Sequence, residues 1–327
     1  MISLVTGGTG YLGGRLVEAL LEGGDEVRVL HRPTSDVSRL SGAVTLVAGD
    51  ITHPESLLPA AEGCDRVFHA AALVKTWVGD PSRFDRVNVE GTLHVCQATR
   101  KLGCRLVYTS SFFALGPTGP DAVNEDRVRS NAPYCTDYER TKTLAEERVR
   151  RRIGEGLDGV ILYPGLVYGP GPLTQGNTIS ILVRDFLRGR VPGIPGSGQQ
   201  KWTFSHIGDV VRGHLAAASQ APSGGRYILG GPVASVEETF QILGRLTGKD
   251  PPRIHVPIPF LKAWGFWGEQ LARLTGHPPT FTRGVAETYR HHWAYDSSKA
   301  FNELGYRWKP LEEGMREVVE YLKGFLK

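Results

Sequence analysis

Tyr138 and Lys142 are the two residues of this sequence whose types and spacing best suit acid–base chemistry. They lie four positions apart in Tyr138–Ile153, a segment with helical periodicity, so both side chains are expected on one face of a helix. A free phenol has a pKa of about 10 and is a poor acid–base group at neutral pH. Because a nearby ammonium favours the phenolate, we expect Lys142 to lower the pKa of Tyr138. The pair therefore predicts proton transfer at an alcohol or carbonyl oxygen.

A serine upstream adds to this pattern. The predicted strand Arg105–Thr109 runs into Ser110 and Ser111, and Ser111 precedes Tyr138 by 27 residues. Open α/β sheets bind ligands at the carboxyl ends of their strands, so Ser111 is expected to hydrogen-bond the substrate oxygen. The alternative is an ordinary turn serine. A second Tyr–Lys pair at the same spacing, Tyr295 and Lys299, has no polar strand end before it and is interpreted as coincidence.

A glycine-rich turn near the N-terminus predicts a phosphate site. Residues 6–13 read TGGTGYLG, between the predicted strand Ile2–Val5 and the predicted helix Leu12–Leu21. Small residues at Gly7, Gly10 and Gly13 allow a sharp turn, close approach of the backbone to a pyrophosphate, and tight packing of the helix on the strand. The alternative is a turn without a ligand. With Tyr138 and Lys142 in the same chain, the turn predicts hydride transfer to or from a nicotinamide dinucleotide.

The end of the second predicted strand bears on the choice of dinucleotide. Glu26–Leu30 is followed by His31 and Arg32, with no carboxylate to bind a ribose 2′-hydroxyl. Arg32, with Thr34 and Ser35 behind it, can hold a 2′-phosphate, which favours NADP. The alternative is that Arg32 stacks on the adenine, which suits NAD equally.

Short apolar strands alternate with helical segments through the first half of the chain. This alternation predicts an α/β fold with a doubly wound parallel Rossmann sheet, which would bring the glycine turn, Ser111 and Tyr138 to one edge. Gly and Pro crowd the sequence after Pro164, and a smaller, mostly helical C-terminal lobe is expected to bind substrate. We expect the dinucleotide domain to span 1–165, with 202–230 returning to it, and the lobe to comprise 166–201 and 231–327. The further strands expected in the first half are Val44–Ala48, Arg66–Ala70 and Gly159–Tyr163, and the further helices are Glu55–Ala61 and Phe84–Leu102.

The composition of the chain excludes several classes of binding partner. The net charge is +4 with scattered Lys and Arg, which argues against nucleic acid as a partner. The cysteines form no CxxC pair, and neither a membrane span nor a leader is recognisable, so we expect reduced thiols in a cytoplasmic protein. His291 and His292 are interpreted as solvated or structural side chains, and no metal is expected. The expected partners are a small-molecule substrate and a second copy in a homodimer.

The order of motifs resembles that of the extended short-chain dehydrogenase/reductase family over nearly the whole chain. The shared motifs are TGGTGYLG (6–13), GDI (49–51), FHAAA (68–72), NVEGT (88–92), YTSS (108–111), YERTK (138–142), YGPG (168–171) and FSHIGDV (204–210). The resemblance implies that Ser111, Tyr138 and Lys142 form the catalytic set and that His69 lies along the cofactor path. With the glycine turn, the expected cofactor-binding residues are Gly7, Gly10, Tyr11, Leu12, Gly13, His31, Arg32, Asp50, Ile51, Ala70, Ala71, Ala72, Asn88, Tyr138, Lys142, Pro164, Gly165, Leu166 and Val167.

Departures from the family's patterns separate its reactions. Phe112 and Phe113 follow Ser111 where sugar-nucleotide dehydratases carry an Asp-Glu pair, and Tyr163 and Leu166 stand where nucleotide-sugar epimerases tend to show Arg and Asn. Residues 163–167 look more like the dihydroflavonol-reductase branch. The stretches FHAAALVKTW, YTSSFFALG, YCTDYERTK and YPGLVYGPG look most like plant-type farnesol dehydrogenases, which use NAD, and like bacterial hopanoid-associated epimerase-like proteins.

Aromatic residues suggest an apolar substrate. We expect Trp77, Phe112 and Phe113 to line the substrate cavity. The run Phe260–Trp267 is expected to form the core of the lobe, and the alternative is that it lines the same cavity. Docking of that run on a membrane surface is a weaker alternative, because it lacks a face rich in Lys and Arg. The favoured function is an NAD(P)-dependent dehydrogenase or reductase of an apolar alcohol or carbonyl, such as farnesol or a dihydroflavonol-like ketone. The alternatives are a nucleotide-sugar epimerase with tightly bound NAD and a non-catalytic dinucleotide sensor.

Overall fold

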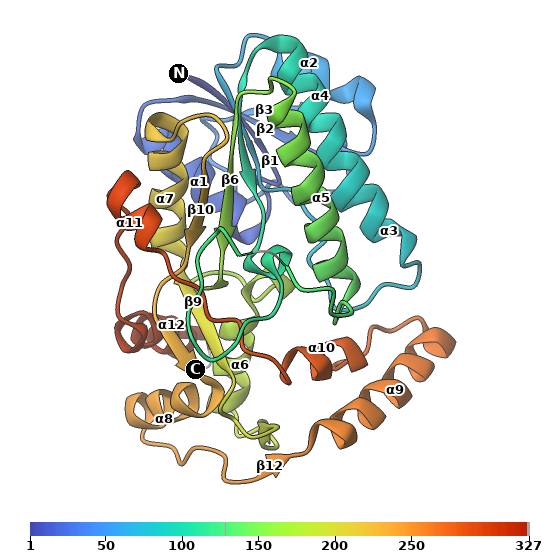
Figure 1. The fold of residues 1–327 in the computed structure, drawn as a ribbon, viewed down its shortest axis with the longest axis vertical. Coiled ribbons are helices and arrows are strands. Elements are labelled where there is room, and N and C mark those ends of the chain that lie inside the picture. The colour runs from blue at the N-terminus through green and yellow to red at the C-terminus, as the bar shows by residue number, and fades with distance from the viewer. Residues whose placement is uncertain (128, 326–327) are drawn as a thin grey trace.

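A twisted parallel sheet forms the centre of the computed structural model, which describes residues 1–127 and 129–325. Its strand order is β10-β6-β5-β4-β1-β2-β3, and every neighbouring pair is parallel. The order reverses at β1, as in a doubly wound sheet, and this confirms the fold class expected from the sequence (Figure 1). The strands are β1 (Ile2–Thr6), β2 (Glu26–His31), β3 (Thr45–Ala48), β4 (Arg66–His69), β5 (Arg105–Thr109), β6 (Gly159–Pro164) and β10 (Arg226–Leu229).

Helices cover both faces of this sheet, because successive strand residues point to opposite sides. Leu4 and Leu106 enter one buried cluster while Val5 and Val107 enter the other. The first face is covered by α2 (Leu57–Ala61), α4 (Thr92–Leu102) and α5 (Asp137–Gly154), and the second by α1 (Tyr11–Glu22), α7 (Ile207–Gln220) and α11 (Ser298–Leu304). Short helical segments join them: η1 (Pro54–Ser56), α3 (Ser82–Phe84), the π-helical η2 (Asp85–Gly91), η3 (Phe112–Leu115) and η4 (Gln175–Asn177).

A smaller, mostly helical part of the chain lies beyond the carboxyl edge of the sheet (Figure 1). Of residues 202–230, α7 and β10 lie with the large sheet, whereas β9 pairs with β7 and β11 in a separate three-stranded sheet. We keep the division into two domains as a proposal. The remaining elements are β7 (Leu166–Tyr168), β8 (Ile194–Pro195), β9 (Lys201–His206), β11 (Val233–Ser235), β12 (His255–Val256), α6 (Thr178–Leu187), α8 (Val236–Thr247), α9 (Ile258–Thr275), α10 (Arg283–Thr288) and α12 (Leu311–Phe325).

The start of α5 is fixed by local hydrogen bonds, which matters because Tyr138 lies in its first turn. The Thr136 hydroxyl accepts a hydrogen bond from Glu139 N at 3.0 Å and caps the helix. The Glu139 carboxylate is buried, accepts a hydrogen bond from Cys135 N at 2.7 Å and pairs with Arg129 at 2.6 Å. The backbone before Tyr138 is therefore held on both sides of the helix start.

The expected role of the aromatic run Phe260–Trp267 is wrong in both of its forms. The run lies on α9, and its Phe260, Trp264 and Trp267 side chains are more than half exposed, so they neither line the main cavity nor form a core. The reason is that α9 packs on its neighbours through small and paired residues on its opposite side. Among the helices of residues 1–127 and 129–325, none combines the length and apolarity that a span of a bilayer requires.

A substitution at Gly13 tests how closely α1 must pack against the glycine turn. A Cβ at Gly13 would lie 2.1 Å from Gly7 O, which is backbone and cannot rotate away. We expect Gly13→Ala to lower the free energy of unfolding by about 1–3 kcal/mol or more, measured by urea denaturation. Gly14→Ala is the matched control, since its Cβ would meet no atom closer than 3.4 Å, and alanine favours a helix. Equal stability of the two variants would contradict the close packing.

Candidate active site

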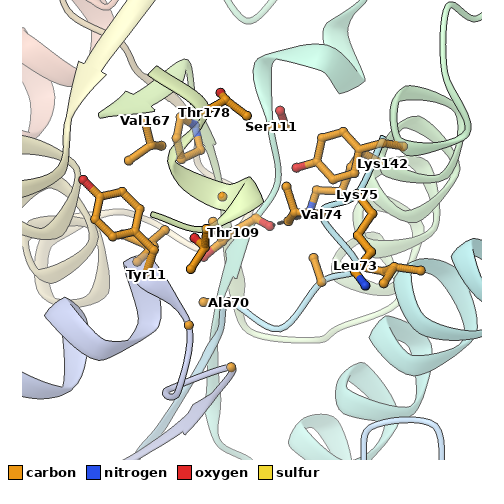
Figure 2. A pocket seen from close by; sticks show the side chains of 18 of the residues that line it. Tyr11, Ala70, Leu73, Val74, Lys75, Thr109, Ser111, Lys142, Val167 and Thr178 are labelled. Carbon is orange, nitrogen blue, oxygen red and sulfur yellow. Dashed lines mark hydrogen bonds between the residues drawn. The ribbon is translucent and has the colours of Figure 1, made fainter. Parts of the chain in front are cut away.

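A cavity of about 890 Å³ runs along the carboxyl edge of the sheet (Figure 2). One part of its wall comes from the loops after β1, β2, β4, β5 and β6, and the other from α6, β9, α8 and α10. It therefore brings together residues that are far apart in the sequence. The predicted site residues that line it are Gly7, Gly10, Tyr11, Leu12, Gly13, His31, Arg32, Asp50, Ile51, Ala70, Ala71, Ala72, Ser111, Phe112, Phe113, Tyr138, Lys142, Pro164, Gly165, Leu166 and Val167.

The glycine turn fits the pyrophosphate of a dinucleotide. Gly7 has φ +77°, and a Cβ there would lie 2.6 Å from Ala71 N, so only glycine allows this approach of the loops after β1 and β4. Gly10 N donates to Gly7 O at 2.9 Å, and α1 begins at the next residue, with no acidic side chain in its first turn. The free N–H groups and the dipole of this helix end favour an anion.

The adenosine end of a dinucleotide would meet one cation and several polar groups. Arg32 is exposed, lines the cavity, and takes part in no ion pair among the described residues. Its carbonyl accepts a hydrogen bond from Ser35 N at 2.9 Å, which bends the loop after β2 and brings Ser35 to the same wall. Asp50 is held by Thr52, whose N–H and hydroxyl both donate to it at 2.9 Å.

Lys142 and Tyr138 come from adjacent turns of α5, and both line the cavity. The Lys142 side chain is buried, its Nζ donates to Thr109 O at 2.8 Å, and it lies 5.0 Å from the centre of the Tyr108 ring. The Tyr138 ring packs edge-on to Phe113 at 6.1 Å between centroids. Figure 2 shows Ser111 on the loop after β5 and Lys142 on the neighbouring helix α5, both at the edge of the cavity.

Burial controls the protonation of this pair. It lowers the pKa of Lys142 to about 7, and it raises the pKa of Tyr138 to about 12, against the opposing effect of the Ser111 hydroxyl. The expectation that the pKa of the phenol is lowered is therefore wrong. The reason is that removing the phenolate from water costs more than the hydrogen bond of the Ser111 hydroxyl returns, and Lys142 does not offset that cost.

A buried hydrogen-bonded chain lies beneath the glycine turn. The Thr92 hydroxyl donates to Asn88 O at 2.7 Å, so its oxygen accepts from Nε2 of His69 at 3.0 Å, and Nδ1 of His69 accepts from the Thr6 hydroxyl at 2.7 Å. Burial lowers the pKa of His69 to about 3, which keeps the ring neutral. His69 does not line the cavity, contrary to the resemblance; it ties the ends of β1 and β4 to α4.

Asn88 and Trp77 also have positions that differ from those expected. Asn88 is buried outside the cavity wall, where its Oδ1 accepts from Leu73 N at 2.7 Å and its Nδ2 donates to the Thr141 hydroxyl at 3.0 Å. It therefore holds the loop after β4 against α5. Trp77 is not part of the cavity wall either, because its ring lies by Gly79 in its own loop.

Sequence reasoning missed the residues that close the cavity from the C-terminal part of the chain. Val285, Thr288 and Tyr289 come from α10 and its end, more than 140 residues after Tyr138, and no local pattern connects them to the site. It also missed two cations, Lys75 and Arg83, in the loop region after β4. The apolar part of the wall comprises Val74, Val87, Phe112, Phe113, Ile179, Leu182, Trp202, Phe204, Val236, Val285 and Tyr289.

Potential metal ligands do not cluster in the described part of the chain, where no three His, Cys, Asp or Glu side chains come together. His292 instead accepts a hydrogen bond from Lys201 N at 3.0 Å, and His291 lies 3.8 Å from Glu287. Both histidines therefore have structural contacts.

Known proteins resemble this chain over its whole length. A sequence model of the NAD-dependent epimerase/dehydratase family matches residues 3–230. Sterol demethylase protein B of Methylococcus capsulatus is 36% identical over 93% of each chain, and a putative dihydroflavonol 4-reductase of Synechocystis is 30% identical over 99% of this chain and 95% of its own. The crystal structure of a UDP-glucose 4-epimerase from Thermotoga maritima with UDP-glucose superposes with a TM-score of 0.80 at 25% identity, covering 100% of both chains.

Because Lys142 is buried, the folding stability of the protein is expected to depend on pH. Its pKa is about 7 in the folded protein against an ordinary 10.5, so between these values the unfolded chain binds more protons at this residue, and its contribution to folding stability rises with pH. We expect the Lys142→Met variant to have a higher free energy of unfolding than the native protein. The difference should be largest at pH 7 and below and should shrink toward pH 10.5. Denaturant unfolding at several pH values measures this.

The control for this series is Lys101→Met, which alters an exposed lysine of α4. Its stability difference from the native protein is expected to stay flat over the same pH range. A Lys142→Met difference that is equally flat would show that the Lys142 ammonium is not desolvated.

Proposed function

The chain belongs to the NAD-dependent epimerase/dehydratase family, within the extended short-chain dehydrogenases/reductases, and on that premise we propose that it is an oxidoreductase of an apolar alcohol or carbonyl compound. The observation that carries this proposal is one cavity in which Ser111, Tyr138 and Lys142 share a wall with the glycine turn, while the remaining wall is largely apolar. Prenyl alcohols such as farnesol, and dihydroflavonol-like ketones, are substrates of suitable chemistry.

The chain's own residues supply proton transfer and orientation. A bound nicotinamide dinucleotide would supply the hydride chemistry. In oxidation, Tyr138 takes the proton of the substrate hydroxyl and Ser111 holds the oxygen; in reduction, Tyr138 donates its proton to the carbonyl oxygen. Lys142, anchored on Thr109 O, faces the same space and binds hydroxyl groups there. Acceptors around Lys142 favour its ammonium form, which in turn favours the phenolate.

The apolar part of the cavity wall favours an apolar substrate over a sugar nucleotide. Each CH₂ group buried there contributes about 0.8 kcal/mol. The names of two relatives, a sterol demethylase protein and a putative dihydroflavonol 4-reductase, also refer to polycyclic compounds rather than to sugar nucleotides. Lys75 and Arg83 also line the cavity and give it two cationic points.

An epimerase that keeps NAD as an internal redox relay is the second candidate, supported by the likeness to a UDP-glucose 4-epimerase. Two positions weigh against it. Tyr163 is buried and donates to the Glu146 carboxylate at 2.7 Å, so it cannot reach a diphosphate, and Leu166 presents an apolar side chain to the cavity. An epimerase would retain its cofactor through purification and show no net change in NAD(P)H absorbance with substrate.

A non-catalytic sensor would not need Tyr138 and Lys142, and both are present. A homodimer and a cytoplasmic location stay predictions.

Replacing the phenol tests the proposed reaction. Tyr138→Phe removes the proton donor and acceptor but keeps the ring that packs on Phe113. We expect turnover of an apolar alcohol, followed as NAD(P)H absorbance, to fall by about a hundredfold to ten-thousandfold. The Kd for the dinucleotide should stay nearly unchanged. Undiminished turnover in this variant would refute the assignment.

Replacing Arg32 tests the choice of dinucleotide. We propose that Arg32 and Ser35 hold the 2′-phosphate of NADP. Arg32→Ala is then expected to weaken NADP binding by about tenfold to a hundredfold, the usual effect of losing a charged hydrogen bond, and to leave NAD binding almost unaltered. Calorimetric titration of both dinucleotides measures this. Equal effects on NADP and NAD would instead indicate stacking of Arg32 on the adenine.

A further inference from the structure

Helix α9 carries its large apolar side chains on the side that faces away from the protein. They recur at intervals of four and three residues and so form one stripe along the helix. We call this stripe the outer face of α9; it comprises Phe260 (60% exposed), Trp264 (54%), Trp267 (70%), Leu271 (60%) and Leu274 (85%). None of the five lines the cavity at the sheet edge, as the described residues define it.

The opposite side of α9 attaches it to the protein largely through a close backbone approach and an ion pair. Gly265 is buried, and a Cβ there would lie 2.6 Å from Arg283 N, so the helix backbone lies directly against the start of α10. The buried Glu269 carboxylate accepts a hydrogen bond from Arg283 N at 2.8 Å and pairs with its guanidinium at 2.7 Å. An ordinary surface helix turns its apolar stripe inward. Since α9 does the reverse, the outer face is not explained by folding.

The position of α9 connects this face to the cavity. Figure 1 shows α9 at the margin of the molecule, alongside α10. Val285, Thr288 and Tyr289 of the α10 region line the apolar part of the cavity. The α9–α10 pair therefore presents one apolar surface to the outside and another to the cavity.

Charge around the outer face identifies the kind of partner. Residues 249–292 contain six Lys and Arg against three Asp and Glu. Each acid is paired within the segment: Asp250 with Arg253 at 3.8 Å, and Glu269 and Glu287 with Arg283 and Lys262 at 2.7 Å. The excess is cationic, and Arg273 is exposed beside Leu274. The run Phe260–Trp267 itself holds one cation, Lys262, but the longer segment 249–292 carries a net charge of +3, which suits an anionic lipid surface.

The shape and composition of the stripe favour lipid over a second copy of the chain. A helix of 18 residues is about 27 Å long and 10 Å wide, which gives a footprint on the order of 300 Å². A stable protein interface needs about 800 Å² from each partner. Tryptophan is enriched at membrane–water interfaces, and the stripe has two of the chain's six.

We propose that the outer face of α9 docks this protein on the surface of a bilayer that contains anionic lipid. In the docked state the helix lies in the plane of the interface, with Phe260, Trp264 and Trp267 among the headgroups and acyl chains. The α9–α10 pair then places the apolar part of the cavity next to the membrane. Docking does not depend on the proposed reaction, and either can fail without the other.

The experiment is co-flotation of the full chain with large vesicles of phosphatidylcholine, with and without phosphatidylglycerol. We expect binding to the phosphatidylglycerol vesicles, weaker binding to phosphatidylcholine alone, and loss of binding at high salt. The double variant Trp264→Ser/Trp267→Ser should lose about tenfold or more in vesicle affinity. Both side chains are exposed, so its melting temperature should match that of the native protein.

The matched control is Trp308→Ser/Phe325→Ser, which removes two exposed aromatic groups from elsewhere on the surface. It is expected to bind vesicles like the native protein. The proposal is overturned if the native protein does not float with either vesicle, or if the α9 and control variants bind equally. It is also overturned if the native protein forms a dimer that the α9 variant abolishes, without vesicle binding, since the outer face then serves self-association.

Discussion

Removing the Lys142 ammonium and the Tyr138 phenol from water is the physical constraint on which the rest of the structure depends. Burial lowers the pKa of Lys142 to about 7 and raises the pKa of Tyr138 to about 12. Burial therefore disfavours the charged form of each side chain. Thr109 O gives the lysine one acceptor at the end of β5, and the Thr136 cap fixes the turn of α5 that carries the phenol. A ligand that offers further acceptors to Lys142 therefore changes the state of both groups.

The same edge of the sheet gathers the other parts of the site because parallel strands all end there. The close contact of Gly7 with Ala71 and the chain from Thr6 through His69 to Thr92 join the ends of β1 and β4 beneath the glycine turn. Asn88 lies in a π-helical segment, a feature often found near functional sites, and fastens the next loop to α5. The glycine turn is thus fastened by contacts with the neighbouring strand ends, while Val285 and Thr288 of α10 border the cavity from the C-terminal part of the chain.

Much of this could be predicted from the sequence, because strand and helix periodicity are local signals. The six strands of the first half and the glycine turn lie within a residue or two of their predicted ranges, and the Tyr138–Lys142 spacing placed both residues on one wall. Three features could not be predicted. The sense of the Tyr138 pKa shift depends on burial, the packing of Asn88 on Leu73 depends on tertiary contacts, and the outward orientation of Trp264 reverses the usual rule that apolar stripes face inward.

The measurement that tests the central claim most directly is the titration of Tyr138 itself, by NMR of protein labelled with ¹³C at the tyrosine ring, in the free state and saturated with dinucleotide. Tyr138→Phe assigns the signal. The account predicts a pKa near 12 in the free protein and a clearly lower value once the dinucleotide is bound. A phenol that titrates at its ordinary value in both states, or is indifferent to the dinucleotide, would contradict it.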